Sequence, residues 1–306
     1  MMKKIIILLV ALLSYSFSAT NGDIILYKVA NKDHTITAQT LADGLTVNGY
    51  VVAKNQDMNG PYQKQFKTTT FESYNLMSIY HPDTSVALVP KYAKSGIFTP
   101  FSIATYQRKG EDDFYIALLS ASAQENILKI KDTLITKLET LNKETIHKIL
   151  PTAVETSLPY SNIPTDKALY TKYSFEVDDA DAMEARGDLM MMMESGMKPS
   201  GFVVANYIDF NKVLTEEKKE DYMFYDAYSL CKLKIIYELS KAKPEAGAFA
   251  PCTMVIYHKK GSNKTEIVTL SIANLTSTLA IKDKKLLEML NKAQNTMKSI
   301  IEDSAE

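Results

Sequence analysis

Two cysteines, Cys231 and Cys252, have the clearest potential for chemistry in this 306-residue sequence, and the chain has no others. The sequence leaves three interpretations open: a structural disulfide, two buried thiols that pack as small apolar side chains, or a reactive redox or metal-binding pair. No CxxC spacing is present. Lys232 and His258 could lower a thiol pKa, but His258 alternates to the strand face opposite Tyr257, where it could simply be exposed. The two structural interpretations are therefore favoured.

A run of methionines, Met190 to Met193, is the second unusual feature of the sequence. Thioether sulfur binds Cu(I), so Met190, Met193 and Met197 are candidate ligands for copper. However, Met183, Met190 and Met197 recur every seven residues, and Met193 falls on the same helical face. That spacing is typical of a helix stripe that packs against a core. A core role is the favoured interpretation, with copper as the alternative.

Other chemistry is not supported by any motif. The four histidines lack the spacings typical of zinc ligands, and no nucleophile elbow, phosphate-binding loop or dinucleotide-binding glycine pattern is present. We therefore expect no cofactor and favour a protein that is not an enzyme. The chain has two arginines, Arg108 and Arg186, and its lysines are scattered. Nucleic-acid binding usually requires a concentrated basic face, so nucleic acid is not an expected partner.

The N-terminal residues have the pattern of a secretory signal. Positive charge in Met1–Lys4 is followed by the apolar run Ile5–Leu13 and by the mostly small or polar residues of Ser14–Ala19. Nine apolar residues are too few for a spanning helix, which needs about 20. We expect cleavage after Ser18 or Ala19 and a periplasmic or secreted protein without a stable membrane span. In that compartment a disulfide can persist.

An internal repeat organises the remaining chain. Gly49–Ala53 recurs as Gly201–Ala205, and six of the fifteen residues from Gly96 to Gly110 are identical in Gly247–Gly261. A period this long indicates a duplicated domain rather than a solenoid. We predict a signal peptide over residues 1–19, a first repeat over 20–150, a proline-rich linker over 151–168 and a second repeat over 169–306.

Each repeat is predicted to contain the same order of strands and helices. Apolar alternation and turn residues predict an α+β domain in which an antiparallel sheet carries helices on one face. The expected strands of the first copy are 24–29, 49–58, 74–80, 98–107 and 114–121, with helices at 36–48, 84–94 and beyond 127. Those of the second copy are 173–177, 201–210, 225–231, 249–258 and 266–273, with helices at 179–196, 233–243 and beyond 286. The turn Lys260–Asn263 has the composition of a hairpin turn.

Three segments of the second copy resemble a family known as domain of unknown function 302. They are Tyr228–Cys231 at a strand end, the turn Lys243–Gly247, and the strand Pro251–Tyr257 that begins with Pro-Cys. The match covers about Tyr173–Glu302. The resemblance implies a β-α-β4-α fold like that of the TATA-binding protein in each copy, and it implies no activity.

The first copy, about Ile24–Leu150, resembles the family only through its alignment with the second. Tyr80 and Phe101 stand where the second copy has Cys231 and Cys252, so both cysteines are replaced together by aromatic residues. Paired replacement suggests that the two positions face one another across adjacent elements.

Two functions are consistent with these patterns. The first is a non-enzymatic exported module that binds a small ligand or a protein, with the two repeats packed as an intramolecular pseudo-dimer. The alternative is a periplasmic thiol-redox or copper-handling protein that uses Cys231 and Cys252, with the first copy as a structural partner.

Overall fold

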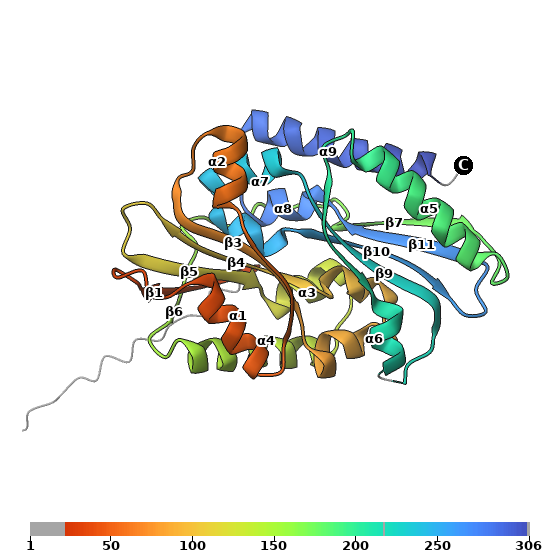
Figure 1. Ribbon diagram of the computed structural model, residues 1–306, viewed down its shortest axis with the longest axis horizontal. Helices are drawn as coiled ribbons and strands as arrows, with labels where there is room; N and C mark the ends of the chain where they lie inside the picture. The colour runs from red at the N-terminus through yellow and green to blue at the C-terminus, as the bar shows by residue number, and fades with distance from the viewer. Residues whose placement is uncertain (1–21, 217, 305–306) are drawn as a thin grey trace, which may run out of the picture.

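A computed structural model describes residues 22–216 and 218–304. The predicted signal peptide lies outside the described residues. The chain forms two antiparallel sheets, one of six strands and one of five, together with helices that lie mainly on the outside (Figure 1). The predicted α+β class with antiparallel sheets is confirmed. Within the described residues, none of the helices combines the length and the apolar character that a membrane crossing requires.

The first sheet has the strand order β2-β3-β4-β5-β1-β6. Its strands are β1 (Ile24–Ala30), β2 (Val51–Asp57), β3 (Phe71–Tyr80), β4 (Phe101–Arg108), β5 (Asp113–Leu119) and β6 (Val154–Thr156). β6 lies inside the segment predicted to be a linker, and it pairs with β1. Part of that segment is therefore built into the first sheet, because three extended residues complete the unpaired edge of β1.

The helices of the first half are α1 (Ala38–Val47), α2 (Asn59–Phe66), α3 (Ala121–Leu128) and α4 (Thr133–Ile149), with short turns η1 (Pro82–Val86) and η2 (Ala93–Phe98). The prediction of one continuous helix over 84–94 is wrong, because residues 84–88 end one helical segment and residues 93–94 begin another. Pro90 lies between them, and proline removes a backbone donor and clashes with the preceding helical turn. Asp132 caps α4 by accepting a hydrogen bond from the backbone N–H of Leu134.

The second half repeats this arrangement of elements. Its strands are β7 (Tyr170–Glu176), β8 (Val203–Asp209), β9 (Tyr222–Cys231), β10 (Cys252–Lys259) and β11 (Lys264–Leu270), in the sheet order β7-β11-β10-β9-β8. Its helices are α5 (Ala182–Met197), α6 (Phe210–Glu216), α7 (Leu233–Ala242), η3 (Pro244–Phe249), α8 (Ile272–Thr278) and α9 (Lys284–Asp303). Read in the opposite direction, this order is β8-β9-β10-β11-β7, and it corresponds strand by strand to β2-β3-β4-β5-β1 of the first sheet. The two halves thus share one topology.

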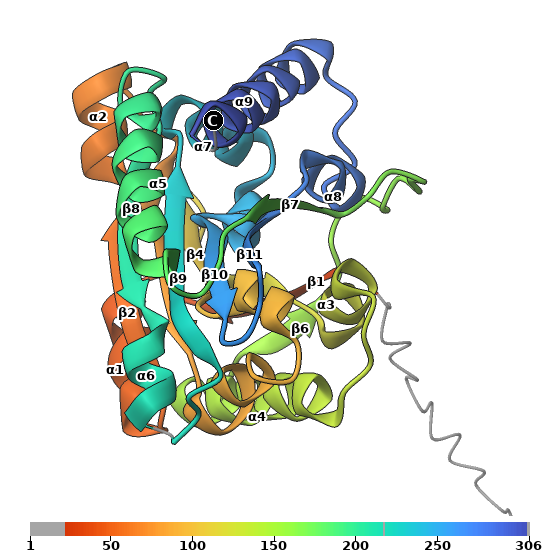
Figure 2. The ribbon, with the colours of Figure 1, turned by 90° about the vertical axis from the view of Figure 1, so that its right-hand side faces the viewer.

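Alternation along β9 divides the core of the second half into two sides. Phe224, Tyr228 and Leu230 pack with Met193 of α5 and with residues of α9. The intervening residues of β9 contribute instead to a larger core that includes the first half. A strand buried on both faces is expected where helices cover one side and another domain covers the other. Figure 2 shows α5 and α9 on the outer side of the second sheet.

Two buried tyrosines join the halves through matching hydrogen bonds. Tyr74 of β3 donates to the carbonyl oxygen of Pro244 at 3.0 Å. Tyr225 of β9 donates to the carbonyl oxygen of Ala93 at 2.5 Å. The two donors, Tyr74 and Tyr225, are 151 positions apart in the sequence. The two acceptors, Ala93 and Pro244, are also 151 positions apart. The contact is therefore the same in both directions, as at a two-fold interface.

A second matching pair of contacts lies beside the first. Ser102 donates through its hydroxyl to the carbonyl oxygen of Pro251 at 3.0 Å, and Thr253 donates to that of Pro100 at 3.0 Å. These residues also differ by 151 positions. All four donors are buried, so their hydrogen bonds satisfy groups that water cannot reach.

Candidate functional site

The two cysteines lie at neighbouring strand ends but on opposite faces of the sheet. Cys231 is the last residue of β9 and Cys252 is the first residue of β10. Cys252 pairs with Leu230 in the antiparallel register, and directly opposed residues point to the same face. Cys231 follows Leu230 and therefore points to the other face. Both thiols are free in the structure.

The predicted disulfide is therefore not formed, and the expectation that the two positions face each other is wrong. The register explains both results. Leu230 belongs to the core formed with α5 and α9, whereas Cys231 packs against the core shared with the first half. In the first sheet Ile79 is paired with Phe101 in the same way, so Tyr80 and Phe101 also occupy opposite faces. The same geometry disfavours a metal ion held between Cys231 and Cys252.

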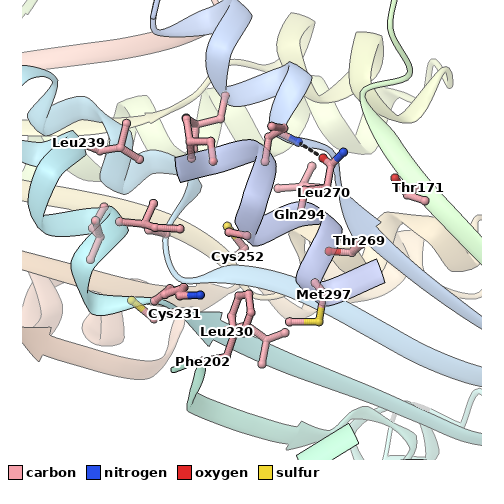
Figure 3. A pocket seen from close by; sticks show the side chains of 18 of the residues that line it. Thr171, Phe202, Leu230, Cys231, Leu239, Cys252, Thr269, Leu270, Gln294 and Met297 are labelled. Carbon is pink, nitrogen blue, oxygen red and sulfur yellow. Dashed lines mark hydrogen bonds between the residues drawn. The ribbon is translucent and has the colours of Figure 1, made fainter. Parts of the chain in front are cut away.

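A cavity of about 140 Å³ lies beside both cysteines. Helices α7, α8 and α9 and the adjoining strand ends enclose it (Figure 3). Its lining is mostly apolar and includes Phe202, Leu230, Cys231, Ile235, Ile236, Leu239, Ala246, Ala250, Cys252, Leu270, Ile272, Leu275, Leu290, Ala293 and Met297. The polar lining residues are Thr171, Tyr173, Lys232, Thr269, Gln294 and Lys298. A concave, largely apolar space with a few polar groups is the usual form of a small-ligand site.

Gln294, one of the polar lining residues, has a structural role. The side-chain Oε1 of Gln294 accepts a hydrogen bond from the backbone N–H of Ile272 at 2.8 Å, at the start of α8 (Figure 3). In the first half the carboxylate of Glu139 accepts from the N–H of Ala121 in the same manner. Gln294 thus fixes α8 against α9 and holds one wall of the cavity in place.

Burial keeps both thiols protonated at neutral pH. It raises the pKa of Cys252 to about 11. It also raises the pKa of Cys231 to about 12, with a smaller contribution from Cys252. Nucleophilic or metal-binding chemistry needs the thiolate, which these surroundings disfavour. The raised pKa values support the interpretation of two inert thiols rather than a reactive pair.

Alkylation of the folded protein tests this interpretation. At pH 8 a thiol with a pKa of about 11 is ionised in only about one molecule in 1,000. We expect iodoacetamide to label the unfolded protein much faster than the folded one at pH 8. Labelling of the folded protein should accelerate as the pH rises toward 11. Rapid labelling of the folded protein at pH 8, measured by intact mass, would contradict the protonated state of the thiols.

His258 is buried and lies on the same strand face as Cys252 but six residues along β10. The sequence indicates that His258 could be exposed, and this is wrong, because the side chain is fully buried. Its Nδ1 lies 3.0 Å from the Thr265 hydroxyl, and its Nε2 lies 2.9 Å from the Asp179 carboxylate. Asp179 also accepts from the backbone N–H of Gly261 at 2.7 Å, and these hydrogen bonds lower its pKa. His258 thus ties the start of α5 to the β10–β11 turn and does not reach the cysteines.

The methionines of α5 divide between core and surface. Met193 and Met197 are buried in the core with α9, and Met190 is half-buried at its edge. Met183 is 49% exposed, so the prediction that it shares this core stripe is wrong. It lies in the first turn of α5, where Ala182 rather than Met183 is buried in this core. The described residues contain no group of three or more His, Cys, Asp or Glu side chains placed to hold a metal ion.

Sequence reasoning missed an ionic cluster beneath α5. Arg186 donates from Nε and Nη2 to the two carboxylate oxygens of Asp226, each at 2.7 Å. Tyr207 donates to Asp226 at 2.8 Å and accepts from Arg186 at 2.9 Å. Asp226 is fully buried, and its carboxylate raises the pKa of the Arg186 guanidinium. A charged residue in the middle of the apolar strand β9 was the available signal.

Among residues 22–216 and 218–304, no ion pair lies at the equivalent place in the first sheet. Asn75 there corresponds to Asp226, and its side chain donates to Asn55 at 2.9 Å. Asn55 corresponds to Tyr207. At equivalent positions the first half therefore has hydrogen-bonded neutral amides, whereas the second half has an ion pair.

The second half has an α+β fold with a largely apolar cavity, and most of it is similar to a known protein family. Residues 184–304 match the family model described as Domain of unknown function DUF302. The resemblance found in the sequence is confirmed over that stretch. No curated protein matches the chain.

One solved structure of the same family is similar to this chain. It is the crystal structure of an uncharacterized conserved protein DUF302 from Bacillus stearothermophilus, with 16% sequence identity and a TM-score of 0.37. The alignment covers 46% of this chain and 100% of that chain.

Proposed function

We propose that this protein is a non-enzymatic binding module whose second half holds a small, largely apolar ligand in the cavity beside Cys231 and Cys252. The observation that carries the proposal is the cavity itself, about 140 Å³ and lined mainly by apolar side chains. A dry apolar cavity of about 150 Å³ in another protein accepts benzene, so the space is adequate for a ligand of that size.

The sequence difference between the two halves supports the same proposal. Cys231 and Cys252 line the cavity, and the equivalent residues of the first half are Tyr80 and Phe101. Both aromatic side chains are buried there. Small side chains at these positions leave space that two rings would fill. The ligand site is therefore assigned to the second half, with the first half as a packing partner.

The matching contacts of Tyr74 with Pro244 and of Tyr225 with Ala93 support an intramolecular pseudo-dimer as the frame of this module. Export is inferred from the pattern of Met1–Ala19. Intact mass of the protein isolated from its host should then correspond to a chain that lacks about 19 residues. The raised thiol pKa values argue against the thiol-redox alternative.

Filling the cavity tests the proposal. Cys252→Phe introduces the residue that the first half carries at the equivalent position, and it should abolish binding of benzene to the folded protein. Cys252→Ser changes the thiol but not the space, so it should bind benzene within about threefold of the natural protein. Binding can be followed by NMR titration of methyl resonances, with circular dichroism as the control for folding.

The two variants also separate the proposed function from a thiol function. Loss of binding in Cys252→Ser as well as in Cys252→Phe would indicate that the thiol itself is required. Benzene binding that survives Cys252→Phe, or that is absent from the natural protein, would overturn the cavity as the site.

A further inference from the structure

The charged side chains that line the cavity are both cations. The charged residues that line it are Lys232 and Lys298, and the described lining contains no carboxylate. Lys298 lies 3.7 Å from Glu302 on the exposed side of α9, so its charge is partly balanced. Lys232 forms no ion pair with any residue of 22–216 or 218–304, which leaves its charge unbalanced.

The ammonium group of Lys232 is held at the cavity by an aromatic ring. It lies 4.8 Å from the ring centroid of Phe202, which also lines the cavity. Partial burial and the nearby charge of Lys292 lower the pKa of Lys232. An ammonium group without a carboxylate partner, partly removed from water, is stabilised by any anion that reaches it.

The N-terminus of α7 adds to the positive electrostatic potential that Lys232 creates beside the cavity. Lys232 is the N-cap residue of α7, and its side chain makes no capping hydrogen bond. By contrast, Ser271 caps α8 by accepting from the N–H of Ala273. Uncapped N–H groups and the helix dipole favour a negative charge near the first turn of a helix. Ile235 and Ile236 of this helix line the cavity, so its positive end lies beside the apolar space.

We infer that the ligand is a small amphiphilic carboxylate, whose apolar part fills the cavity and whose carboxylate contacts Lys232 at the start of α7. This inference rests on the proposed function and specifies its ligand class. The size of the cavity limits the apolar part to about the size of benzene or of a five-carbon chain. Longer chains would have to extend out of the cavity.

Paired probes of equal shape test the inference on the full chain. Hexanoate and hexanamide have the same apolar part but differ in charge, and calorimetric titration can compare their dissociation constants. We expect hexanoate to bind the natural protein about tenfold more tightly than hexanamide. Lys232→Met keeps the aliphatic stem and removes the charge, so it should remove this tenfold preference and leave hexanamide binding unchanged. Lys285→Met, at an exposed site of α9 outside the lining, is the matched control and should retain the preference.

The outcomes distinguish the inference from the proposed function. If benzene and hexanamide bind but hexanoate is not preferred, the cavity is a ligand site and the inference about charge is wrong. The inference is also wrong if Lys285→Met weakens hexanoate binding as much as Lys232→Met does. If benzene and hexanamide fail to bind, or if hexanoate binding persists in Cys252→Phe, the cavity itself is not the site.

Discussion

Replacement of Arg186 by methionine is expected to destabilise the protein by about 3–5 kcal/mol. The substitution leaves the carboxylate of Asp226, which is fully buried in β9, without its cationic partner. Tyr207 alone cannot replace the two hydrogen bonds that Arg186 donates. A buried charge without compensation costs far more than the pair contributes when intact. Urea unfolding followed by circular dichroism measures the change.

Two further variants show whether the cost arises from the unpaired charge. Arg186→Gln combined with Asp226→Asn gives the second half neutral amides, as Asn75 and Asn55 provide in the first half. This double variant should recover more than half of the stability lost in Arg186→Met. Lys212→Met removes an exposed cation 3.8 Å from Asp209 and should change stability by less than about 0.5 kcal/mol. A loss below 1 kcal/mol in Arg186→Met would contradict this account.

Adding a methyl group at Gly96 is expected to cost about 3 kcal/mol. A Cβ atom at Gly96 would lie 1.8 Å from the hydroxyl oxygen of Tyr225 and 2.7 Å from its Cζ. The ring must therefore move, and Tyr225 loses the hydrogen bond that it donates to Ala93 across the interface. Gly247→Ala repeats the experiment on the other side of the interface, where the Cβ would lie 2.5 Å from the Cβ of Ala104.

Matched variants isolate the role of the interface. Gly187 lies in α5 with no atom within 4 Å of an added Cβ, so Gly187→Ala should stabilise by up to about 1 kcal/mol through helix propensity. Tyr225→Phe removes only the hydroxyl group and should cost about 1 kcal/mol. Urea unfolding again provides the measurement. If Gly96→Ala and Gly187→Ala have the same stability, close packing between the halves at η2 is not as described.

Local sequence patterns were sufficient for most of the individual elements. Strands β1, β8 and β10 were predicted to within a few residues, because apolar alternation and flanking glycines are local signals. The hairpin turn Lys260–Asn263 connects β10 and β11, with Gly261 at a φ of +76°, as its composition indicated. The short helices α2 and α6 were missed, since helices of eight and seven residues make only about two turns and show little of a period.

The resemblance to the family could also be recognised from residues alone, because it depends on short segments such as Lys243–Gly247 and Pro251–Tyr257. A shared offset likewise reveals which residues of the two halves correspond. The offset does not reveal which face of the sheet a given residue occupies. The assignment of Cys231 and Cys252 to facing positions failed for this reason, since one step of register reverses the face.

The sequence by itself determined the class of fold, the order of the main strands and the resemblance of the second half to the family. Tertiary structure alone decided the state of the thiols, the burial of His258, the ion pair of Arg186 with Asp226 and the cavity beneath α9. The physical reason is the range of the interactions involved. Periodicity and turn chemistry act over a few residues, whereas burial, pKa and cavity volume depend on side chains that distant segments bring together.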